Sequence, residues 1–484
     1  MKKKLLIVLS WVLCAACLIG CGTPSNLVVE SGSDQPTVSE SQSQATTVIT
    51  DATQNSTQVT TSESTEPLTE APTNTQSETQ TEIPTETETE PVIETETQTE
   101  TQTEAQTETQ TDPPTETEKK TEKVDPIPGK TTTTETLKAK EYNLSKGAAL
   151  FRYIGRSKQT TSGIICDHAA SGIEFQGYMT GKVSITVSSM KADTYYTVYI
   201  DDKRVDTRFC AKEGNDRTIE IADFKGKYFH KIKILKQSEI GWTGSMLETL
   251  NITGYLVKAP ANRDLYIEFY GDSLTAGFGN IGKPSSASPY DRPLYQDATQ
   301  SFGFLFSEMA GADCSILAMS GVGLSVGYYD EPFLNYFSKY SHLRGSEKFN
   351  FTGARVPDLA VIHLGANDES VGDSPNNKAG YGESTGSFKT NFKNKAKELI
   401  SYIREGYKTD VPIVWAYDPA EGVPNYIQEV LDELGGESAG LYILELKWKG
   451  IANFTGAGSH PSALAHEEHA DLLAELVIKK KILK

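Results

Sequence analysis

The chain has 484 residues, a length that suits about three domains. Residues 26–140 contain no Phe, Tyr or Trp and consist mainly of Thr, Glu, Gln, Ser and Pro, so they lack the apolar surface needed to fold. With 6 Lys against 23 Asp or Glu residues, this segment accounts for most of the formal net charge of −19. The rest of the chain is nearly balanced, which argues against the basic surface of a nucleic-acid-binding protein.

Residues 1–20 have the pattern of a secretory signal, with Lys2 to Lys4 followed by an apolar run that is too short for a stable membrane span. The sequence Leu18-Ile19-Gly20-Cys21 resembles a bacterial lipobox, so Cys21 is predicted to carry a lipid at the mature N-terminus. An ordinary signal peptide is the alternative. We expect a protein anchored on the outer face of a bacterial membrane through this lipid alone.

Residues 21–140 are predicted to be a disordered tether. Thr alternates with Glu over about residues 81–118, where closely spaced like charges repel one another and Pro adds stiffness. Such a segment holds a folded unit away from the membrane, and its hydroxyls are candidates for glycosylation.

Residues 141–260 are predicted to form a β-sandwich of the jelly-roll type. Apolar residues repeat at every second position in short runs separated by turn residues, and no helical stripe intervenes. These runs are Ile173 with Phe175, Val183 to Val187, Tyr196 to Ile200, Ile219 with Ile221, and Ile232 with Ile234.

Residues 261–484 show alternating strand and helix patterns, which predict a parallel sheet with helices on both faces. Ligands bind beyond the carboxyl ends of strands in such three-layer domains. Strands are expected at 265–270, 314–319, 359–364, 413–416 and 441–446, and helices at 388–403, 427–434 and 462–480.

The residues that follow the first three of these strands suit nucleophilic catalysis. Ser273 follows the first strand in the sequence Gly271-Asp272-Ser273-Leu274, at a strand-to-helix turn. Gly321 follows the second strand and Asn367 the third. A glycine N–H and an Asn amide can stabilise an oxyanion beside Ser273, although each residue taken singly also fits a structural turn.

His460 follows the fifth strand, directly before the last helix, and is the candidate base for the Ser273 proton. His363 is expected to pack within the sheet. His466 and His469 lie one turn apart on the last helix, where solvent-exposed positions are expected rather than a metal pair. No metal site is expected, because no Cys pair has zinc spacing and no third ligand accompanies the two His residues.

Gly271 to Leu274, Gly321, Gly365-Ala366-Asn367-Asp368 and His460-Pro461, in this order, resemble the four blocks of the SGNH (GDSL-type) hydrolases. With the preceding β-domain, the chain is similar to family-two carbohydrate esterases over about residues 145–480. The resemblance implies a flavodoxin-like sheet and acyl transfer by Ser273 and His460. It also implies an oxyanion hole formed by the Ser273 N–H, the Gly321 N–H and Asn367, and no cofactor or metal.

One position departs from the SGNH pattern, in which an Asp commonly precedes the catalytic His by three residues. Here that position is Ala457. The family-two esterases, which this chain resembles, use a backbone carbonyl in place of the Asp to hold the imidazole. What orients His460 is therefore left open by the sequence.

The expected substrate is an acetylated plant polysaccharide of the xylan or glucomannan type, with O-acetylated peptidoglycan, a lipid ester, or inert sugar binding as alternatives. Trp415, Tyr417 and Trp448 follow the fourth and fifth strands, where they either stack on a sugar ring or seal the end of the sheet. Cys166 and Cys210 fall in one predicted domain and could pair in an oxidising compartment, but four thiols in so long a mature chain are no disulfide scaffold. We expect a monomer.

Overall fold

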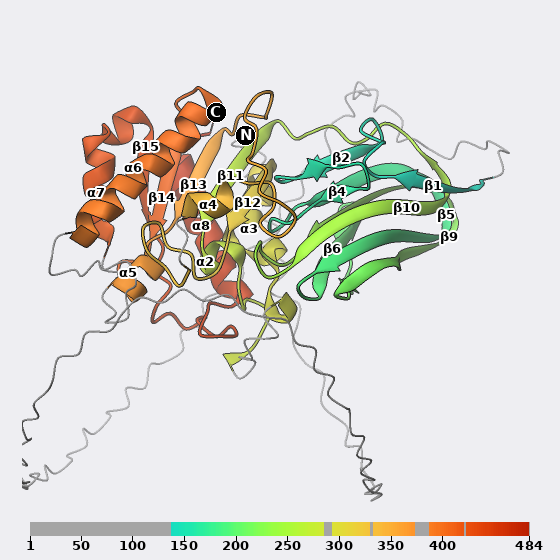
Figure 1. Cartoon of the computed structure of the whole chain (residues 1–484), viewed down its shortest axis with the longest axis horizontal. Helices are drawn as coiled ribbons and strands as arrows, with labels where there is room; N and C mark the ends of the chain where they lie inside the picture. Colours follow the sequence, from blue (N-terminus) through green and yellow to red (C-terminus); the bar gives the residue numbers. More distant parts are fainter. Residues whose placement is uncertain (1–136, 285–292, 330–332, 373–386, 421–422, 484) are drawn as a thin grey trace, which may run out of the picture. The chain divides into compact units, whose positions relative to one another are not determined.

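The computed structural model describes residues 137–284, 293–329, 333–372, 387–420 and 423–483. These residues form an antiparallel β-domain and an α/β domain with a parallel sheet, whose elements are labelled in Figure 1. The predicted signal peptide, the lipidation of Cys21 and nearly all of the tether fall on residues 1–136, outside the described part.

The β-domain is an antiparallel sheet whose main path runs β3-β4-β10-β5-β9-β6-β7, with β1, β2 and β8 pairing at its sides. This confirms an all-β antiparallel domain, while the jelly-roll order stays a prediction. The strands are β1 Ala139–Asn143, β2 Phe151–Ile154, β3 Lys158–Gln159, β4 Ile164–Ile165, β5 Gly172–Met190, β6 Thr194–Ile200, β7 Lys203–Arg204, β8 Phe209–Ala211, β9 Gly214–Lys236 and β10 Gly244–Leu256.

Two strands are much longer than the sequence indicated. β5 has 19 residues and β9 has 23, and each contains two of the runs expected to be separate strands. The pairing of β5 with β9 shifts register between Met179 and Gly181, and Gly181 has a φ of +64°. A β-bulge bends a strand without ending it, so glycine there marks a bend that resembles a turn in the sequence.

The α/β domain contains five parallel strands in the order β12-β11-β13-β14-β15, which is the flavodoxin-like arrangement. All five expected strands are present, as β11 Leu265–Gly271, β12 Ala312–Ala318, β13 Leu359–His363, β14 Ile413–Tyr417 and β15 Leu441–Glu445. The helices are α2 Ser273–Ala276, α3 Phe302–Ala310, α4 Phe333–Phe337, α5 Ala366–Gly372, α6 Ser387–Tyr407, α7 Pro424–Glu433 and α8 Ala463–Lys480, with short 3₁₀ turns η3 Ala298–Gln300 and η5 Gly436–Ala439.

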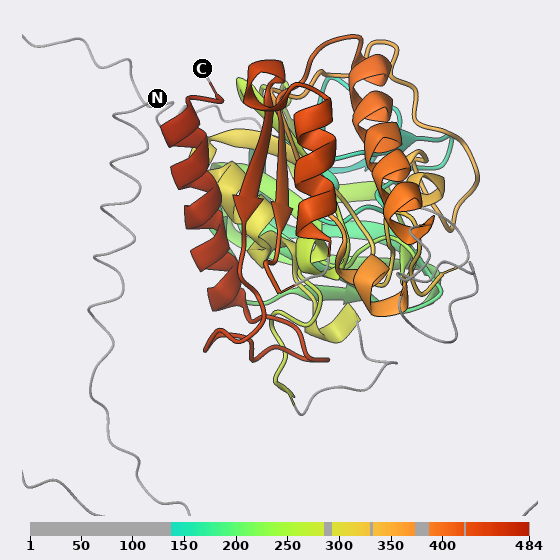
Figure 2. The same cartoon turned by 90° about the vertical axis from the view of Figure 1, so that its left-hand side faces the viewer.

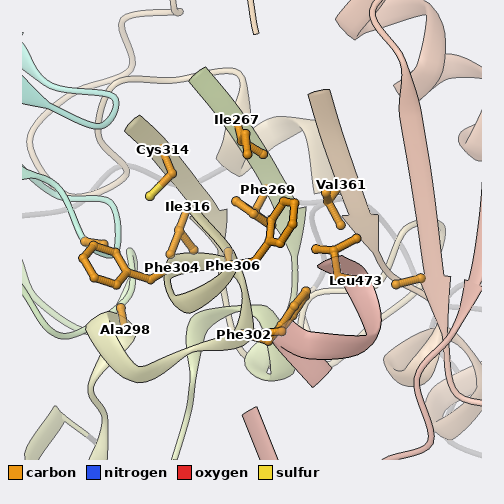
Figure 3. Packing of buried hydrophobic residues seen from close by; sticks show 14 of the residues in the cluster. Ile267, Phe269, Ala298, Phe302, Phe304, Phe306, Cys314, Ile316, Val361 and Leu473 are labelled. Atoms are coloured by element: carbon orange, nitrogen blue, oxygen red, sulfur yellow. The ribbon is translucent and has the colours of Figure 1, made fainter. Parts of the chain in front are cut away.

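Helices cover both faces of the parallel sheet, and each face has its own apolar core. Helices α3 and α8 pack on one face, where the rings of Phe269 and Phe302 meet edge to face with centroids 6.0 Å apart (Figure 3). Helices α4, α6 and α7 pack on the other face. Figure 2 shows α8, in dark red, and the orange helices on opposite sides of the last two strands. The predicted three-layer arrangement is therefore present.

Polar contacts join the two domains. Arg152 Nη1 of β2 donates to Asp313 Oδ1 of β12 at 2.5 Å, and both side chains are largely buried. Arg204 of β7 pairs with the buried Asp297 just before η3. A β-bridge links Ala169 to Ile316 of β12. The domains thus share buried side chains along their border.

All three cysteines in the described residues are free thiols. Cys166 and Cys314 are buried, and Cys210 is partly exposed. The possible Cys166–Cys210 disulfide is therefore absent from this structure. Among the described helices, none combines the length and the hydropathy that crossing a bilayer requires.

Candidate active site

The four residues singled out by the sequence line one cavity of about 800 Å³. Ser273 follows β11, Gly321 follows β12, Asn367 follows β13, and His460 lies in the loop before α8. Because the strands are parallel, their carboxyl ends open onto the same edge of the sheet. The structure therefore brings together groups that are separated by almost 200 residues in the chain.

Ser273 is the first residue of the short helix α2, and it is 8% exposed. The preceding Asp272 caps this helix, because its carboxylate accepts the Leu274 N–H at 3.0 Å. Gly271 allows the turn to be this tight, since a Cβ at that position would lie 2.0 Å from Thr275 Oγ1 and 2.8 Å from the His363 carbonyl oxygen. These contacts fix the direction in which the serine enters the cavity.

Gly321 lies at the start of the loop after β12, with a φ of +79° that favours glycine. Its carbonyl oxygen accepts the Tyr328 N–H at 2.9 Å, which closes the loop on itself. The carboxylate of Asp368 accepts the N–H groups of Leu324, Ser325 and Val326 at 2.7 to 3.1 Å. This loop is held by several hydrogen bonds, as a preorganised donor requires.

Asn367 is the second residue of α5, and its side-chain amide already has two acceptors. Nδ2 donates to Asp272 Oδ2 at 3.2 Å and to the Val322 carbonyl oxygen at 3.0 Å. These bonds connect the loops that follow β11, β12 and β13. An oxyanion that forms beside Ser273 therefore competes with an existing acceptor for this amide.

His460 is oriented by a backbone carbonyl. Its Nδ1 lies 2.8 Å from the Gly458 oxygen, and a carbonyl oxygen can only accept, so Nδ1 carries the proton. Nε2 then holds the lone pair that a general base needs. Ala457, at the position where related hydrolases often have an Asp, is buried, and its N–H donates to the Gly279 oxygen at 2.9 Å.

Three fully buried carboxyl groups lie behind the cavity wall, on Asp272, Asp368 and Glu239. Burial raises the pKa of Asp272 to about 7, and the carboxyls of Asp368 and Glu239 add to this shift. Burial also raises the pKa of Glu239 to about 7, against hydrogen bonds from Ser320 that lower it. The loops that carry Ser273, Gly321 and Asn367 are thus held by buried acidic side chains.

Of the three aromatic residues expected either to stack on a sugar or to seal the sheet, Trp448 lines the cavity, whereas Trp415 and Tyr417 do not. Trp415 is fully buried, its indole N–H points to the Leu364 carbonyl oxygen at 3.3 Å, and it does not line the cavity. Tyr417 is partly exposed but also lies outside the cavity lining. Trp448 reaches the cavity wall while remaining 1% exposed, and its indole N–H donates to His363 Nε2 at 3.0 Å. For Trp415, the structure favours the alternative in which the ring seals the sheet.

Other aromatic residues, which the sequence analysis missed, form the wall of the cavity. Tyr328 is 67% exposed beside Gly321, in a Gly- and Tyr-rich loop that is visible in the sequence. Trp242 comes from the β-domain, and no local pattern links it to the site. The aromatic residues of the lining that were not singled out from the sequence are Trp242, Phe278, Tyr295, Tyr328, Tyr329 and Phe454.

The histidines of α8 are buried, so their expected solvent exposure was wrong. His466 accepts the Phe302 N–H at its Nδ1 at 3.2 Å, and His469 Nε2 lies 3.2 Å from the Lys447 carbonyl oxygen. His363 is buried in β13 as expected. Within the described ranges, no three metal-ligating side chains are grouped as an ion would need.

Comparison with known proteins gives matches in both domains. Residues 153–260 match the family model described as carbohydrate esterase 2 N-terminal. The chain is 23% identical over 330 residues to the cellulase/esterase CelE of Acetivibrio thermocellus, covering 65% of this chain and 37% of that protein. It is 26% identical over 258 residues to an acetylxylan esterase/glucomannan deacetylase of Cellvibrio japonicus, covering 52% of this chain and 70% of that protein.

Among solved structures, a family two carbohydrate esterase from Clostridium thermocellum in complex with cellohexaose has a similar fold. The TM-score is 0.57 at 23% identity, and the match covers 69% of this chain and all of that chain. This match extends over both folded domains.

Proposed function

Because the chain resembles the carbohydrate esterases of family two within the SGNH hydrolases, we propose that it removes O-acetyl groups from plant polysaccharides of the xylan or glucomannan type. One observation carries the proposal. Ser273, Gly321, Asn367 and His460 line a single cavity, and the Nδ1 of His460 is tied to a carbonyl oxygen.

In the proposed mechanism, His460 Nε2 takes the proton of the Ser273 hydroxyl while the serine oxygen attacks the acetyl carbonyl carbon. The tetrahedral intermediate collapses when the sugar oxygen leaves with the proton held by His460. Water then gives a proton to His460 Nε2 and attacks the acetyl-serine. When the second tetrahedral intermediate collapses, the serine oxygen leaves as acetic acid forms, and it takes the proton back from His460, which restores both residues. The imidazole keeps its orientation throughout, because the Gly458 carbonyl oxygen accepts a hydrogen bond from the Nδ1–H in both charge states.

The oxyanion of the intermediate is proposed to receive the N–H groups of Ser273 and Gly321 and one N–H of Asn367. In the free protein, that amide bonds to the Val322 carbonyl oxygen and to Asp272. We propose that Asn367 Nδ2 gives up its hydrogen bond to the Val322 carbonyl oxygen and donates to the oxyanion instead. The amide then interacts more strongly with the transition state than with the substrate, which is what accelerates a reaction.

The size and lining of the cavity support a carbohydrate ester. About 800 Å³ accommodates more than an acetyl group, and the lining includes aromatic rings, whose faces can stack on sugar rings. We propose that Tyr328, rather than Trp415, supplies such a face, because its ring is 67% exposed. The proposed lipid on Cys21 and the acidic tether would hold this site away from the membrane, which favours a polymer over a membrane lipid as substrate.

The proposal is tested by acetate release from a panel of acetylated xylan, acetylated glucomannan, O-acetylated peptidoglycan and a short-chain lipid ester. We expect release from the plant polysaccharides, and a loss of at least about 1000-fold in kcat for Ser273→Ala, since the nucleophile is removed. Ser370→Ala is a matched control, because Ser370 also lines the cavity but its hydroxyl donates to the Ala366 carbonyl oxygen of its own helix.

Each alternative has its own result in this panel. Faster release from peptidoglycan or from the lipid ester would show that the proposed substrate is wrong, whereas the proposed esterase mechanism would still hold. Retention on a polysaccharide column without acetate release would favour a sugar-binding protein. Full turnover by Ser273→Ala would show that Ser273 is not the nucleophile and that the proposed active site is wrong.

A further inference from the structure

The hairpin between β9 and β10 extends from the β-domain to the α/β domain. There it meets the loop after β12 that contains Gly321, which we call the oxyanion loop. The base of the hairpin is held by Lys236, which is fully buried and donates to three carbonyl oxygens. Lys236 Nζ lies 2.5 Å from the Asp167 oxygen, 3.0 Å from the Glu239 oxygen and 2.8 Å from the Thr243 oxygen. An ammonium group bound in this way holds the hairpin in one conformation.

The Glu239 side chain crosses from this hairpin to the residue before Gly321. Its Oε2 accepts the Ser320 N–H at 3.0 Å and the Ser320 hydroxyl at 2.8 Å. Glu239 is fully buried and Ser320 is 6% exposed, so water does not compete for these bonds. Bonds between a carboxylate and buried donors are among the stronger hydrogen bonds in proteins.

Neighbouring residues of the hairpin pack closely on the same loop. Ile240 belongs to the apolar cluster that contains Met319. A Cβ on Gly241 would lie 2.7 Å from the Met319 Cε, and Gly241 has a φ of +95°. The β-domain therefore touches Met319 and Ser320, the two residues that lead into Gly321.

From these contacts we infer that Glu239 is a positioning residue of the esterase site, which sets the direction of the Gly321 N–H through Ser320. The far part of the same loop is held by Asp368 of the α/β domain, so the loop is fixed from both domains. The inference rests on the proposed function, and it makes the β-domain part of the catalytic unit. A donor displaced by about 1 Å can cost about 100-fold in rate.

The test compares Glu239→Leu, Glu239→Gln and the wild-type chain in kcat and KM for p-nitrophenyl acetate. Glu239→Leu removes the acceptor, so we expect kcat to fall about 10- to 100-fold while KM changes less than about threefold. Glu239→Gln keeps an oxygen that accepts the Ser320 N–H, so kcat is expected within about fivefold of the wild-type value. The affinity for a tetrahedral phosphonate mimic of the intermediate should fall with kcat, which a purely structural role would not cause.

Arg204→Met is the matched control at the domain border. It removes the contact of Arg204 with Asp297 and Thr299, while Asp297 keeps hydrogen bonds from Gln237 and Thr299. We expect kcat within about twofold of the wild-type value, because this contact does not reach the oxyanion loop. A similar loss in Arg204→Met and Glu239→Leu would overturn the inference, since any weakening of the border would then suffice.

Ser320→Ala keeps the test decisive if Glu239→Leu does not fold. In a double-mutant cycle of Ser320→Ala with Glu239→Asp, whose shorter side chain draws the carboxylate away from Ser320, we expect the combined effect on kcat to differ from the product of the two single effects by at least about threefold. Independent effects would overturn the inference. An inactive wild-type chain would contradict the proposed function itself, whereas an active wild-type chain with an equally active Glu239→Leu variant would contradict only the role of Glu239.

Discussion

At the scale of single residues, the imidazole of His460, the proposed base, is oriented by a backbone carbonyl rather than by a carboxylate. The Gly458 carbonyl oxygen selects the tautomer with the proton on Nδ1, as a carboxylate would. A neutral carbonyl stabilises the imidazolium less than a charged group does. In the proposed mechanism, the rate therefore depends more heavily on the oxyanion donors, and on Asn367 in particular.

Asn367→Ala is expected to lower kcat about 100- to 1000-fold, with a much smaller change in KM, because the lost donor acts on the transition state. Steady-state kinetics with p-nitrophenyl acetate measure both constants. Since Asn367 also bonds to Asp272 and Val322, thermal unfolding should be measured alongside. An unchanged kcat in a folded variant would exclude Asn367 from the oxyanion hole.

Tyr328→Ala is expected to separate binding of the polymer from chemistry. Its exposed ring offers a stacking face, so we expect KM for acetylated polysaccharide to rise about 5- to 50-fold, with little change for p-nitrophenyl acetate. Trp415→Phe is the comparison, because that ring lies in the core and its loss should affect stability rather than KM. The stacking role fails if Tyr328→Ala deacetylates the polymer as the wild-type chain does.

At the scale of elements, helix α8 supports the sheet with a face that includes two buried histidines. His466 lies among Phe302 and Trp448, with ring centroids at 6.4 Å and 5.0 Å. Burial lowers the pKa of His466 to about 3 and that of His469 to about 4. Both rings are therefore neutral in the folded protein near pH 7. Protonation of either ring would place a charge in the buried face of the helix, which destabilises the fold.

A pH dependence of stability follows from His466. Because its folded pKa lies below the value of about 6.5 for an unfolded chain, its stabilising contribution is complete above pH 6.5 and is lost as the pH falls toward 3. As the pH falls from about 7.5 to 5, this residue lowers the free energy of unfolding of the wild-type chain by about 2 kcal/mol. His466→Asn keeps an acceptor for the Phe302 N–H but takes up no proton in this range.

We therefore expect the free energy of unfolding of His466→Asn to fall about 2 kcal/mol less than that of the wild-type chain between those pH values. Urea denaturation at each pH measures the difference. The buried carboxyls of Asp272 and Glu239 shift in the opposite direction and are common to both proteins, so they cancel in the comparison. Equal losses in the two proteins would show that His466 does not titrate on unfolding in this range.

At the scale of the whole molecule, the two folded domains share polar side chains that neither could bury alone. Arg152 of the β-domain bonds to Asp313 of the α/β domain, and Glu239 bonds to Ser320. Separating the domains would expose these partners or leave them unpaired, which is costly for buried charges. The domains should therefore unfold together.

We expect a single unfolding transition for the folded region, with coincident midpoints by tryptophan fluorescence and far-UV circular dichroism. The fluorescence reports on Trp242 in the β-domain as well as on Trp415 and Trp448 in the α/β domain. Two separated transitions would show that the border contributes little to stability, and would also weaken the case for Glu239.

The sequence alone determined the strands and main helices of the α/β domain, because burial on one face leaves a local periodicity that can be read from the chain. It also determined the order of the blocks around Ser273, Gly321, Asn367 and His460, since residues that end parallel strands must meet at one edge of the sheet. The similarity to family-two esterases was visible in the same residues. These features depend on short stretches and on their order.

Only the tertiary structure decided how deeply each side chain is buried and which distant groups touch. It placed Trp415 in the core, buried His466 and His469, joined the expected short strands into β5 and β9, and brought Glu239 of one domain against Ser320 of the other. Burial depth and contacts across a domain border result from packing over long sequence separations. No local pattern encodes them, whereas the three-dimensional fold fixes them through close packing and the pairing of buried polar groups.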